Sequence, residues 1–415
     1  MKIKIRKKYL FYALAFSSAI ITSINAGVDV IVSNFFIQNV WALGLATFLV
    51  GIPVSLFFGL IFSIPFKGKS IGSRVIDPSF KRLRLIKKQE IVPQSIAAFG
   101  NAINTVGYFA LLSLFKDPSV VLPFSQIVIL YIVAVESINE KDVPTISEIQ
   151  SILIVTFGAI LGSLSLSGSI NPMGMLIVFV VINPGWMLLS IYQRKLKWMK
   201  INEESNDSIN IRFWNVIFSC LITIGIMMVF DVFYGTQNLM AGFQASYTHF
   251  FPAAAISIGA FFALVIYIRA LGIGKASVVQ AIKSSTIIFS IPVSLILSYY
   301  AIIDPFPTDP TLLIIKFIGI SIMVLGIISF ALNLVKAYIF VTLKPGFPIE
   351  ETMQKIWNIR GVSNVSATAG TYDYIIEIRT RALVKGYEKI IRKIEHIPAI
   401  DEFKWESVLK EWEDI

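Results

Sequence analysis

Cysteine and histidine are almost absent from this chain. It contains one cysteine, Cys220, and two histidines, His249 and His396, which are far apart in sequence. A single cysteine excludes an intramolecular disulfide, and so few soft ligands leave no cluster with the spacing of a metal site. The sequence also lacks a phosphate-binding loop, a nucleophile motif and a haem motif. It therefore predicts no metal, no cofactor and no enzymatic activity.

Charged residues are scarce as well. They make up 15% of the chain, whereas hydrophobic residues make up 55% and the mean hydropathy is +0.74. This balance excludes an ordinary soluble protein and indicates a membrane protein. The net charge of +10 comes mainly from three connections, 1–9, 65–91 and 193–212. The positive-inside rule places them and both termini in the cytoplasm, so we expect a multi-pass protein of the cell membrane with no nucleic-acid partner.

Ten apolar runs are long enough to cross a bilayer core of about 30 Å. They span residues 10–30, 41–64, 92–115, 118–137, 150–168, 172–192, 213–234, 251–272, 276–300 and 312–335. The fold class that we expect for this region is membrane all-α, with ten transmembrane helices in contact with the lipid bilayer.

Two short strings recur at one offset of 158 residues. Ile24-Asn25-Ala26-Gly27 returns as Ile182-Asn183-Pro184-Gly185, and Ser119-Val120-Val121 returns as Ser277-Val278-Val279. A shared offset indicates an internal repeat, with halves at about 10–168 and 172–335. Five crossings per half is an odd number, so the second half must be inverted, which is an architecture that transporters use to build a central site.

The basic start followed by an apolar run is also typical of a signal peptide, with a cleavage stretch that ends at Ala26. Asn25 argues against cleavage because it belongs to the repeated string, which a discarded segment has no reason to carry. We therefore expect the first helix to remain in the protein.

Residues 10–336 resemble the drug/metabolite transporter superfamily, EamA-like branch. The residues that carry the resemblance are Tyr108-Phe109-Ala110-Leu111, Ser119-Val120-Val121, Glu136, Gly158, Gly162, Arg194-Lys195-Leu196, Arg269-Ala270-Leu271-Gly272, Ser277-Val278-Val279 and Pro292. The resemblance implies a ten-helix carrier over residues 1–336 but names no substrate. The second half has no counterpart of Glu136, so we assign that residue no role.

Polar side chains inside the predicted spans are the candidates for a substrate path, because each is costly in hydrocarbon unless it faces a cavity or a partner. They are Asn25, Asp29, Asn101, Asn104, Gln126, Asn183, Gln280 and Lys283. The repeat pairs Asn25 with Asn183, and we expect the two to meet near the axis between the halves. Interhelical hydrogen bonding is the alternative role for the amides, and snorkelling to the cytoplasmic face is the alternative for Lys283.

Two further features of the spans carry expectations. Asp29 lies one turn beyond Asn25, where it could attract a cation or a proton, or mark the membrane interface. Gly185 follows Pro184, and we expect this pair to unwind or kink the sixth helix.

The composition changes abruptly at Ala337. The pattern over 337–415 predicts strand, helix, strand, strand, helix and strand, with Gly370-Thr371 as a hairpin connection and a last strand around Phe403 and Trp405. This order is that of a ferredoxin-like βαββαβ domain of the α+β class.

This tail resembles the effector-binding domain of the Lrp/AsnC regulators. The matching segments are Val341-Thr342-Leu343-Lys344-Pro345-Gly346, Ile359-Arg360-Gly361-Val362, Ala369-Gly370-Thr371-Tyr372-Asp373-Tyr374-Ile375 and Ile397-Pro398-Ala399-Ile400. The resemblance implies an amino-acid effector site that includes Gly370, Tyr372 and Asp373, and a homodimer formed through this domain. The alternative is hairpin geometry, since glycine permits positive φ and aspartate satisfies turn amides. The DNA-binding helix-turn-helix of the family has no counterpart here.

Together these features favour a secondary transporter for a small polar metabolite, such as an amino acid or a related compound. It would work by alternating access, with a tail that senses an amino acid or mediates dimerisation. The alternative is a membrane-anchored amino-acid sensor in which the helices only hold the tail at the membrane. Neither the substrate nor the direction of transport can be read from the sequence.

Overall fold

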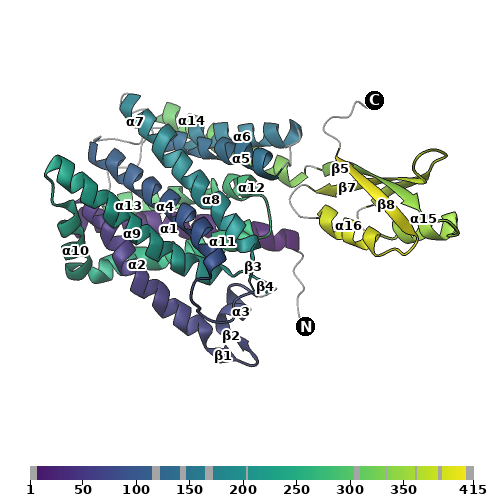
Figure 1. Cartoon of the computed structure of the whole chain (residues 1–415). Coiled ribbons are helices and arrows are strands. Elements are labelled where there is room, and N and C mark those ends of the chain that lie inside the picture. The colour runs from purple at the N-terminus through teal and green to yellow at the C-terminus, as the bar shows by residue number, and fades with distance from the viewer. Residues whose placement is uncertain are drawn as a thin grey trace.

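The computed structural model describes residues 7–114, 122–140, 146–163, 172–201, 204–302, 309–332, 334–359, 362–381 and 386–407. The repeated string Ser119-Val120-Val121 lies outside these residues. The described part consists of a large helical bundle followed by a small sheet with two helices, which Figure 1 shows beside each other.

Helices account for nearly all of the bundle. They are α1 (Lys7–Phe35), α2 (Val40–Ser63), α3 (Ile71–Val75), α4 (Lys88–Leu114), α5 (Val128–Glu140), α6 (Ile146–Ser163), α7 (Pro172–Ile177), α8 (Asn183–Trp198), α9 (Ser208–Tyr234), α10 (Asn238–Thr248), α11 (Phe250–Leu271), α12 (Ala276–Lys283), α13 (Thr286–Tyr299) and α14 (Pro310–Leu332). A 3₁₀ helix (Leu122–Ile127) precedes α5 and a π-helical segment (Val178–Ile182) joins α7 to α8. Two short hairpins, β1 (Pro65–Phe66) with β2 (Lys69–Ser70) and β3 (Lys200–Ile201) with β4 (Glu204–Ser205), lie in connections.

Seven helical segments of the described chain are long and apolar enough to cross a membrane. They are Leu10–Phe35, Val40–Ser63, Pro172–Trp198, Ser208–Tyr234, Phe250–Leu271, Ala276–Tyr299 and Pro310–Ser329. Such a set indicates a membrane-spanning protein, but it does not confirm the ten predicted crossings. The other three predicted spans fall on α4, which is long but carries polar residues, and on the shorter apolar helices Phe124–Glu136 and Ile149–Gly162.

The predicted distortion of the sixth span is present, although it begins before the glycine. Pro184 lacks a backbone N–H, and the turn that precedes it widens into the π-helical segment Val178–Ile182. Gly185 serves a different purpose, because a Cβ there would stand 2.8 Å from the carbonyl oxygen of Gly100 and 2.9 Å from the amide nitrogen of Asn104. It allows α8 to pack closely against α4.

The helix pairs follow an exchange pattern. α1 packs against α11 and α4 packs against α8; in the same way α2 packs against α11 and α4 packs against α9. The first three spans are α1, α2 and α4 in the first predicted half, and α8, α9 and α11 in the second. The contact of α1 with α11 therefore corresponds to that of α8 with α4, and the contact of α2 with α11 corresponds to that of α9 with α4. α6 packs against α14, and these are the last helices of the two halves.

The sequence did not indicate α10. Residues 235–250 read as a connection between two spans, yet Asn238–Thr248 form a helix that packs along α2, with Gly242 placed directly against Leu45. In Figure 1 this helix lies at one end of the bundle, and the C-terminal sheet lies toward the opposite end, as does the start of α1.

The tail confirms the predicted order of strands and helices. Its elements are β5 (Leu334–Leu343), α15 (Ile349–Trp357), β6 (Val362–Ala367), β7 (Tyr374–Arg381), α16 (Gly386–Glu395) and β8 (Ile400–Ser407). The four strands form one antiparallel sheet in the order β6-β7-β5-β8, as expected for a ferredoxin-like domain. β5 begins at Leu334, three residues before the predicted start, so a single residue separates it from α14.

The core of the tail explains this fold. Alternate residues of the two central strands, Ile339, Val341, Ile376 and Ile378, point to one face of the sheet and are fully buried against the two helices. Both helices are amphipathic, and they cover this face with Ile356 of α15 and Ile394 of α16.

Candidate functional site

A polar cavity of about 540 Å³ lies between α1, α2, α4, α9 and α11. Its polar lining includes Asn25, Asp29, Asn101, Asn104, Arg212 and Ser257. Such a volume is typical of sites for small molecules, which occupy roughly 300–1,000 Å³. The lining segments of α1 and α2 are those next to the α1–α2 connection, so the cavity lies toward the end of the bundle that carries α10.

Four predicted path residues meet at this cavity, namely Asn25, Asp29, Asn101 and Asn104. Asn25 packs directly on Gly259 of α11, where any Cβ would overlap its side-chain oxygen. Asn101 also fulfils the alternative role, because its Nδ2 donates to Asn215 Oδ1 at 3.3 Å and to Ser219 Oγ at 3.0 Å on α9. The cavity therefore explains the polarity that makes α4 differ from the other long helices.

Arg212 is the residue that sequence reasoning missed. It was counted among the basic residues of a connection, but α9 begins at Ser208 and carries Arg212 into the bundle, where it lines the cavity and is only 4% exposed. Its Nε and Nη1 have no hydrogen-bond partner among the described residues. Asp207 gives the signal that could have placed it, because this residue caps the helix by accepting from the amide of Asn210 at 2.8 Å.

The other four candidates lie in a different place, around α5, α8 and α12. Gln126 accepts from Ser284 Oγ at 3.0 Å, and these two residues are 158 positions apart, which is the repeat offset. Gln280 accepts from Trp186 Nε1 at 2.9 Å and from Tyr267 at 3.2 Å. Asn183, which we expected to meet Asn25, donates to the carbonyl of Phe124 at 3.2 Å and does not line the cavity.

Lys283 does not snorkel. It is 7% exposed, and its ammonium lies over the rings of Trp186 and Tyr267, 4.1 and 4.6 Å from the centroids. Cation–π contacts of this kind stabilise a desolvated ammonium by about 2 kcal/mol. The structure thus accounts for the depth of Lys283 by packing against aromatic rings.

A set of buried ion pairs lies at the other end of the bundle. Lys197 at the end of α8 donates to Asp77 Oδ2 at 2.6 Å and to the carbonyl of Asn206 at 2.6 Å. The same carboxylate oxygen accepts from the amide and the hydroxyl of Ser208, both at 2.8 Å. Burial alone raises the pKa of Asp77, but Lys197 and Ser208 outweigh it and hold the pKa below its ordinary value. This carboxylate ties the connection after α3 to α8 and α9.

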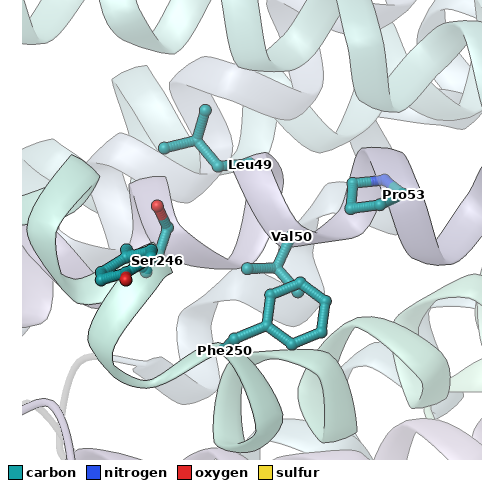
Figure 2. Close-up of a pocket in the computed structure, with 6 residues that line it drawn as sticks. Leu49, Val50, Pro53, Ser246 and Phe250 are labelled. Atoms are coloured by element: carbon teal, nitrogen blue, oxygen red, sulfur yellow. The ribbon is translucent and has the colours of Figure 1, made fainter.

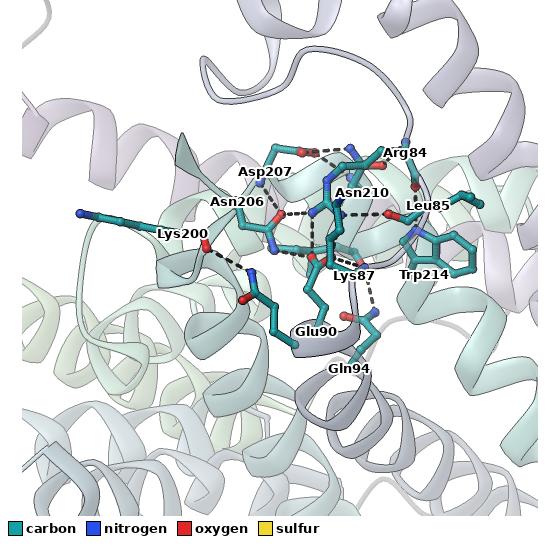
Figure 3. Close-up of polar contacts among 12 residues, drawn as sticks. Arg84, Leu85, Lys87, Glu90, Gln94, Lys200, Asn206, Asp207, Asn210 and Trp214 are labelled. Atoms are coloured by element: carbon teal, nitrogen blue, oxygen red, sulfur yellow. Dashed lines mark hydrogen bonds and ion pairs between the residues drawn. The ribbon is translucent and has the colours of Figure 1, made fainter. Parts of the chain in front are cut away.

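A second pair, Arg84 with Glu90, is drawn in Figure 3 and is linked to the first through Asn206. Arg84 and Glu90 make two parallel bonds of 2.6 and 2.7 Å, and Asn206 bridges them by accepting from Arg84 at 2.8 Å and donating to Glu90 at 2.7 Å. Asn210 accepts from the amide of Arg84 at 3.0 Å. We call these residues, together with Asp77, Lys197, Asp207 and Ser208, the polar lock, because they join the connection before α4 to the start of α9.

Glu136, to which the sequence assigned no role, makes a third buried pair. Its carboxylate pairs with Arg194 of α8 and accepts from the amides of Ala276, at 2.6 Å, and Ser277, at 3.2 Å. These amides open α12, so the carboxylate stabilises a helix N-terminus as well as the guanidinium. Glu136 thus holds α5, α8 and α12 together.

A second pocket, of about 450 Å³, lies between α2 and the α10–α11 corner. Figure 2 shows Leu49, Val50, Pro53 and Phe250 around it, with the hydroxyl group of Ser246 at its edge. No charged side chain lines it. Its walls match an acyl chain rather than a polar solute.

In the tail, the three predicted effector residues differ in what they contact. Asp373 Oδ2 accepts from the amide of Leu343, the last residue of β5, at 2.6 Å, so this carboxylate joins the hairpin to the neighbouring strand and does not bind an amide of the turn itself. Tyr372 packs its ring against Phe340, 5.2 Å between centroids. Gly370 does not adopt positive φ, and a Cβ there would meet nothing within 4 Å. Hairpin geometry therefore does not explain Gly370.

Comparisons with known proteins identify the tail. Residues 336–414 match the family model of the Lrp/AsnC ligand binding domain. The chain therefore carries an Lrp/AsnC ligand-binding domain at its C-terminus. A comparison with curated proteins finds no match.

One solved structure, described only as the crystal structure of a protein, is similar to most of the chain. The similarity covers 77% of this chain and 94% of the other, at 12% identity and a TM-score of 0.51. Because 77% is far more than the tail contains, the likeness extends into the helical bundle. At this identity it shows the fold alone.

The described residues contain no group of three or more histidine, cysteine, aspartate or glutamate side chains that could hold a metal ion.

Proposed function

We propose that residues 1–336 form a secondary transporter for a small polar metabolite, built from ten crossings in two inverted halves. The observation that carries the proposal is the polar cavity with the buried, unpaired Arg212. A polar cavity inside an apolar bundle is costly unless a polar ligand uses it. The resemblance to the drug/metabolite transporter superfamily belongs to this proposal as well.

The helix packing supports two inverted halves. The cavity is lined by α1, α2 and α4 from the first half and by α9 and α11 from the second. The contacts of α1 with α11 and of α4 with α8 exchange the halves, and Gln126 bonds to Ser284 across the repeat offset. In an inverted-repeat carrier, the site lies between the halves in this manner.

The polar lock supports alternating access. The cavity lies toward the α10 end, whereas the lock joins the connection before α4, the end of α8 and the start of α9 at the opposite end. With the predicted topology, this is a state whose cavity faces outward and whose cytoplasmic side is closed. Opening that side requires the lock to separate.

We further propose that the tail adjusts this equilibrium when it binds an amino acid. One residue separates α14 from β5, so a change in the sheet arises within one residue of the last helix. Coupling of this kind typically amounts to 1–3 kcal/mol.

Uptake of labelled amino acids into proteoliposomes tests the transport role. Ala260 lines the cavity on α11, whereas Ala255 on the same helix faces outward. Ala260→Phe fills part of the cavity, and we expect it to reduce uptake at least about tenfold. The matched control Ala255→Phe adds the same ring on the outside and should leave uptake near that of the unmodified protein.

The outcomes separate the transporter from the sensor. Equal uptake by Ala260→Phe and Ala255→Phe would show that the cavity is not the path. No uptake of any compound, together with amino-acid binding by the full-length protein, would favour the membrane-anchored sensor.

A further inference from the structure

The cavity holds one basic and one acidic side chain, Arg212 and Asp29. Arg212 is 4% exposed, and its Nε and Nη1 have no hydrogen-bond partner among the described residues. Asp29 is partly buried on the wall of the same cavity, and no hydrogen bond or ion pair joins its carboxylate to another described residue. Buried charges are almost always paired, because an unpaired one loses its hydration without compensation. A ligand that bears both complementary charges would compensate the two together.

The packing contacts place the two charges at different depths. Asn25 of α1 lies on Gly259 of α11, and nearby on α11 Ser257 Oγ donates to the carbonyl of Thr47 of α2 at 3.0 Å. Gly51 of α2 in turn lies against Val216 of α9, which a Cβ would approach to 3.1 Å. The same Cβ would come within 3.7 Å of Ser257 Oγ, so Gly51, Val216 and Ser257 lie at one level, and Asn25 lies at the level of the nearby Gly259.

Arg212 is one helical turn from Val216 toward the start of α9, and Asp29 is one turn from Asn25 toward the end of α1. Both helices start at the same end of the bundle in the predicted topology, so these two steps lead in opposite directions. The guanidinium thus enters from the closed end of the cavity and the carboxylate from the α10 end.

We infer that the cavity binds a small zwitterion, with its carboxylate on Arg212 and its ammonium toward Asp29. The inference rests on the proposed carrier role and adds to it the class of substrate. A guanidinium offers two parallel donors to a carboxylate, and this geometry selects carboxylates over other oxygen groups.

Thiol protection can test this site without interference from the tail. Thr105 lines the cavity, and Cys220, the one cysteine of the chain, is 2% exposed and points elsewhere in the bundle, against Phe48 and Val216. In a Cys220→Ala background, Thr105→Cys places a single thiol in the cavity. Its reaction rate with a membrane-impermeant maleimide then reports whether the cavity is occupied.

Three groups of probes separate the charges. Glycine, leucine and 4-aminobutyrate carry both; 4-methylpentanoate is leucine without its ammonium, and 3-methylbutylamine is leucine without its carboxylate. We expect at least one zwitterion to slow labelling about tenfold or more at a concentration where the single-charge analogues slow it less than about twofold.

Variants assign the two ends. Arg212→Gln should abolish protection by the zwitterion, whereas Arg212→Lys, which keeps the charge but loses the paired donors, should retain part of it. Asp29→Asn should weaken protection by the zwitterion about tenfold and leave the weak effect of 4-methylpentanoate unchanged. Arg82→Gln, on an exposed part of the connection before α4, is the matched control and should behave as the parent.

Three results would overturn the inference: no protection by any zwitterion, protection by a single-charge analogue as strong as that by the zwitterion, or full protection in Arg212→Gln. The proposed transport role would survive each of them if another compound is taken up. Conversely, protection that follows the expected pattern without uptake of any zwitterion would retain the binding site and contradict the transport role.

Discussion

The two ends of the bundle treat buried charge differently. In the polar lock, the ammonium of Lys197 donates to Asp77 and to a backbone carbonyl, and the guanidinium of Arg84 makes a bidentate pair with Glu90. In the cavity, Arg212 is buried to a similar extent, yet two of its nitrogens have no partner. The charges of the lock are thus paired within the chain, whereas the guanidinium in the cavity is not fully paired among the described residues.

The contrast gives a general way to separate structural from functional charges in a membrane protein. Sequence places Lys197 and Arg212 in the same basic connection, and burial does not distinguish them, at 8% and 4% exposed. Only the hydrogen-bond partners do. Removing a partnered charge should therefore destabilise the fold, and removing the unpartnered one should not.

The largest effect is expected from breaking the lock. Lys197→Met leaves Asp77 buried without its cation, and loss of one member of a buried pair typically costs about 3–5 kcal/mol. Unfolding of the purified protein in detergent would measure this loss. The control is Lys355→Met in α15, where the pair with Glu351 is more than half exposed and should contribute about 0.3–0.5 kcal/mol. Equal stability of the two variants would contradict the distinction between the lock and a surface pair.

Asp207 offers a pH test of the lock. Burial raises its pKa to about 6 from 3.8, although the two bonds from Asn210 oppose the shift. A raised folded-state pKa means that the contribution to stability is full below about pH 4 and is lost as the pH rises through about 6. Asp207→Asn keeps the cap but does not titrate. As the pH rises from about 4 to about 7.5, the free energy of unfolding of Asp207→Asn should therefore increase by about 3 kcal/mol relative to that of the parent protein.

Thermal unfolding of both proteins across this pH range checks the expectation. The sign is the informative part, since a group with a lowered pKa, such as Asp77, acts in the opposite direction. If the parent protein instead becomes more stable relative to Asp207→Asn as the pH rises, the fold stabilises the charged form of the carboxylate, and Asp207 belongs with the paired charges.

Arg212→Met tests the other side of the comparison. The substitution removes a buried charge and leaves no partner group behind without its counterion. We therefore expect the free energy of unfolding to stay equal to that of the parent protein or to rise by up to about 2 kcal/mol. The same detergent unfolding assay measures it, with Lys197→Met beside it. A loss of more than about 2 kcal/mol would show that Arg212 is a structural residue like Lys197.

Sequence predicted well what depends on local pattern. The βαββαβ order of the tail follows from alternation and amphipathic spacing over a few residues, and the structure reproduces it. Asn25, Asp29, Asn101 and Asn104 stand out because a polar side chain in an apolar run is conspicuous, and the structure places all four around one cavity. Their role in a substrate path stays a prediction.

What sequence could not predict depends on contacts between distant segments. Arg212 lies at the edge of an apolar run, where a basic residue reads as a loop charge, and only the helix start at Ser208 places it inside. The role of Glu136 requires the N-terminus of α12, 140 residues away. Asn25 and Asn183 occupy the same place in the repeated string, yet only Asn25 lines the cavity, because Asn183 donates to the carbonyl of Phe124 in another part of the bundle.

The smallest expected effect separates paired from free groups within the tail. Asp373→Ala removes the bond to the Leu343 amide and leaves that donor unsatisfied, which should cost about 1–3 kcal/mol. Gly370→Ala meets no atom within 4 Å and requires no change of φ, so its effect on stability should be within about 0.5 kcal/mol. Calorimetry of the full-length protein with an amino-acid panel then decides its role, with Arg212→Gln in the background to silence the cavity. Loss of binding in Gly370→Ala at unchanged stability would assign this glycine to the effector site, because the added methyl group contacts no atom of the described fold and would therefore act on the bound ligand. Unchanged binding would remove Gly370 from the effector site.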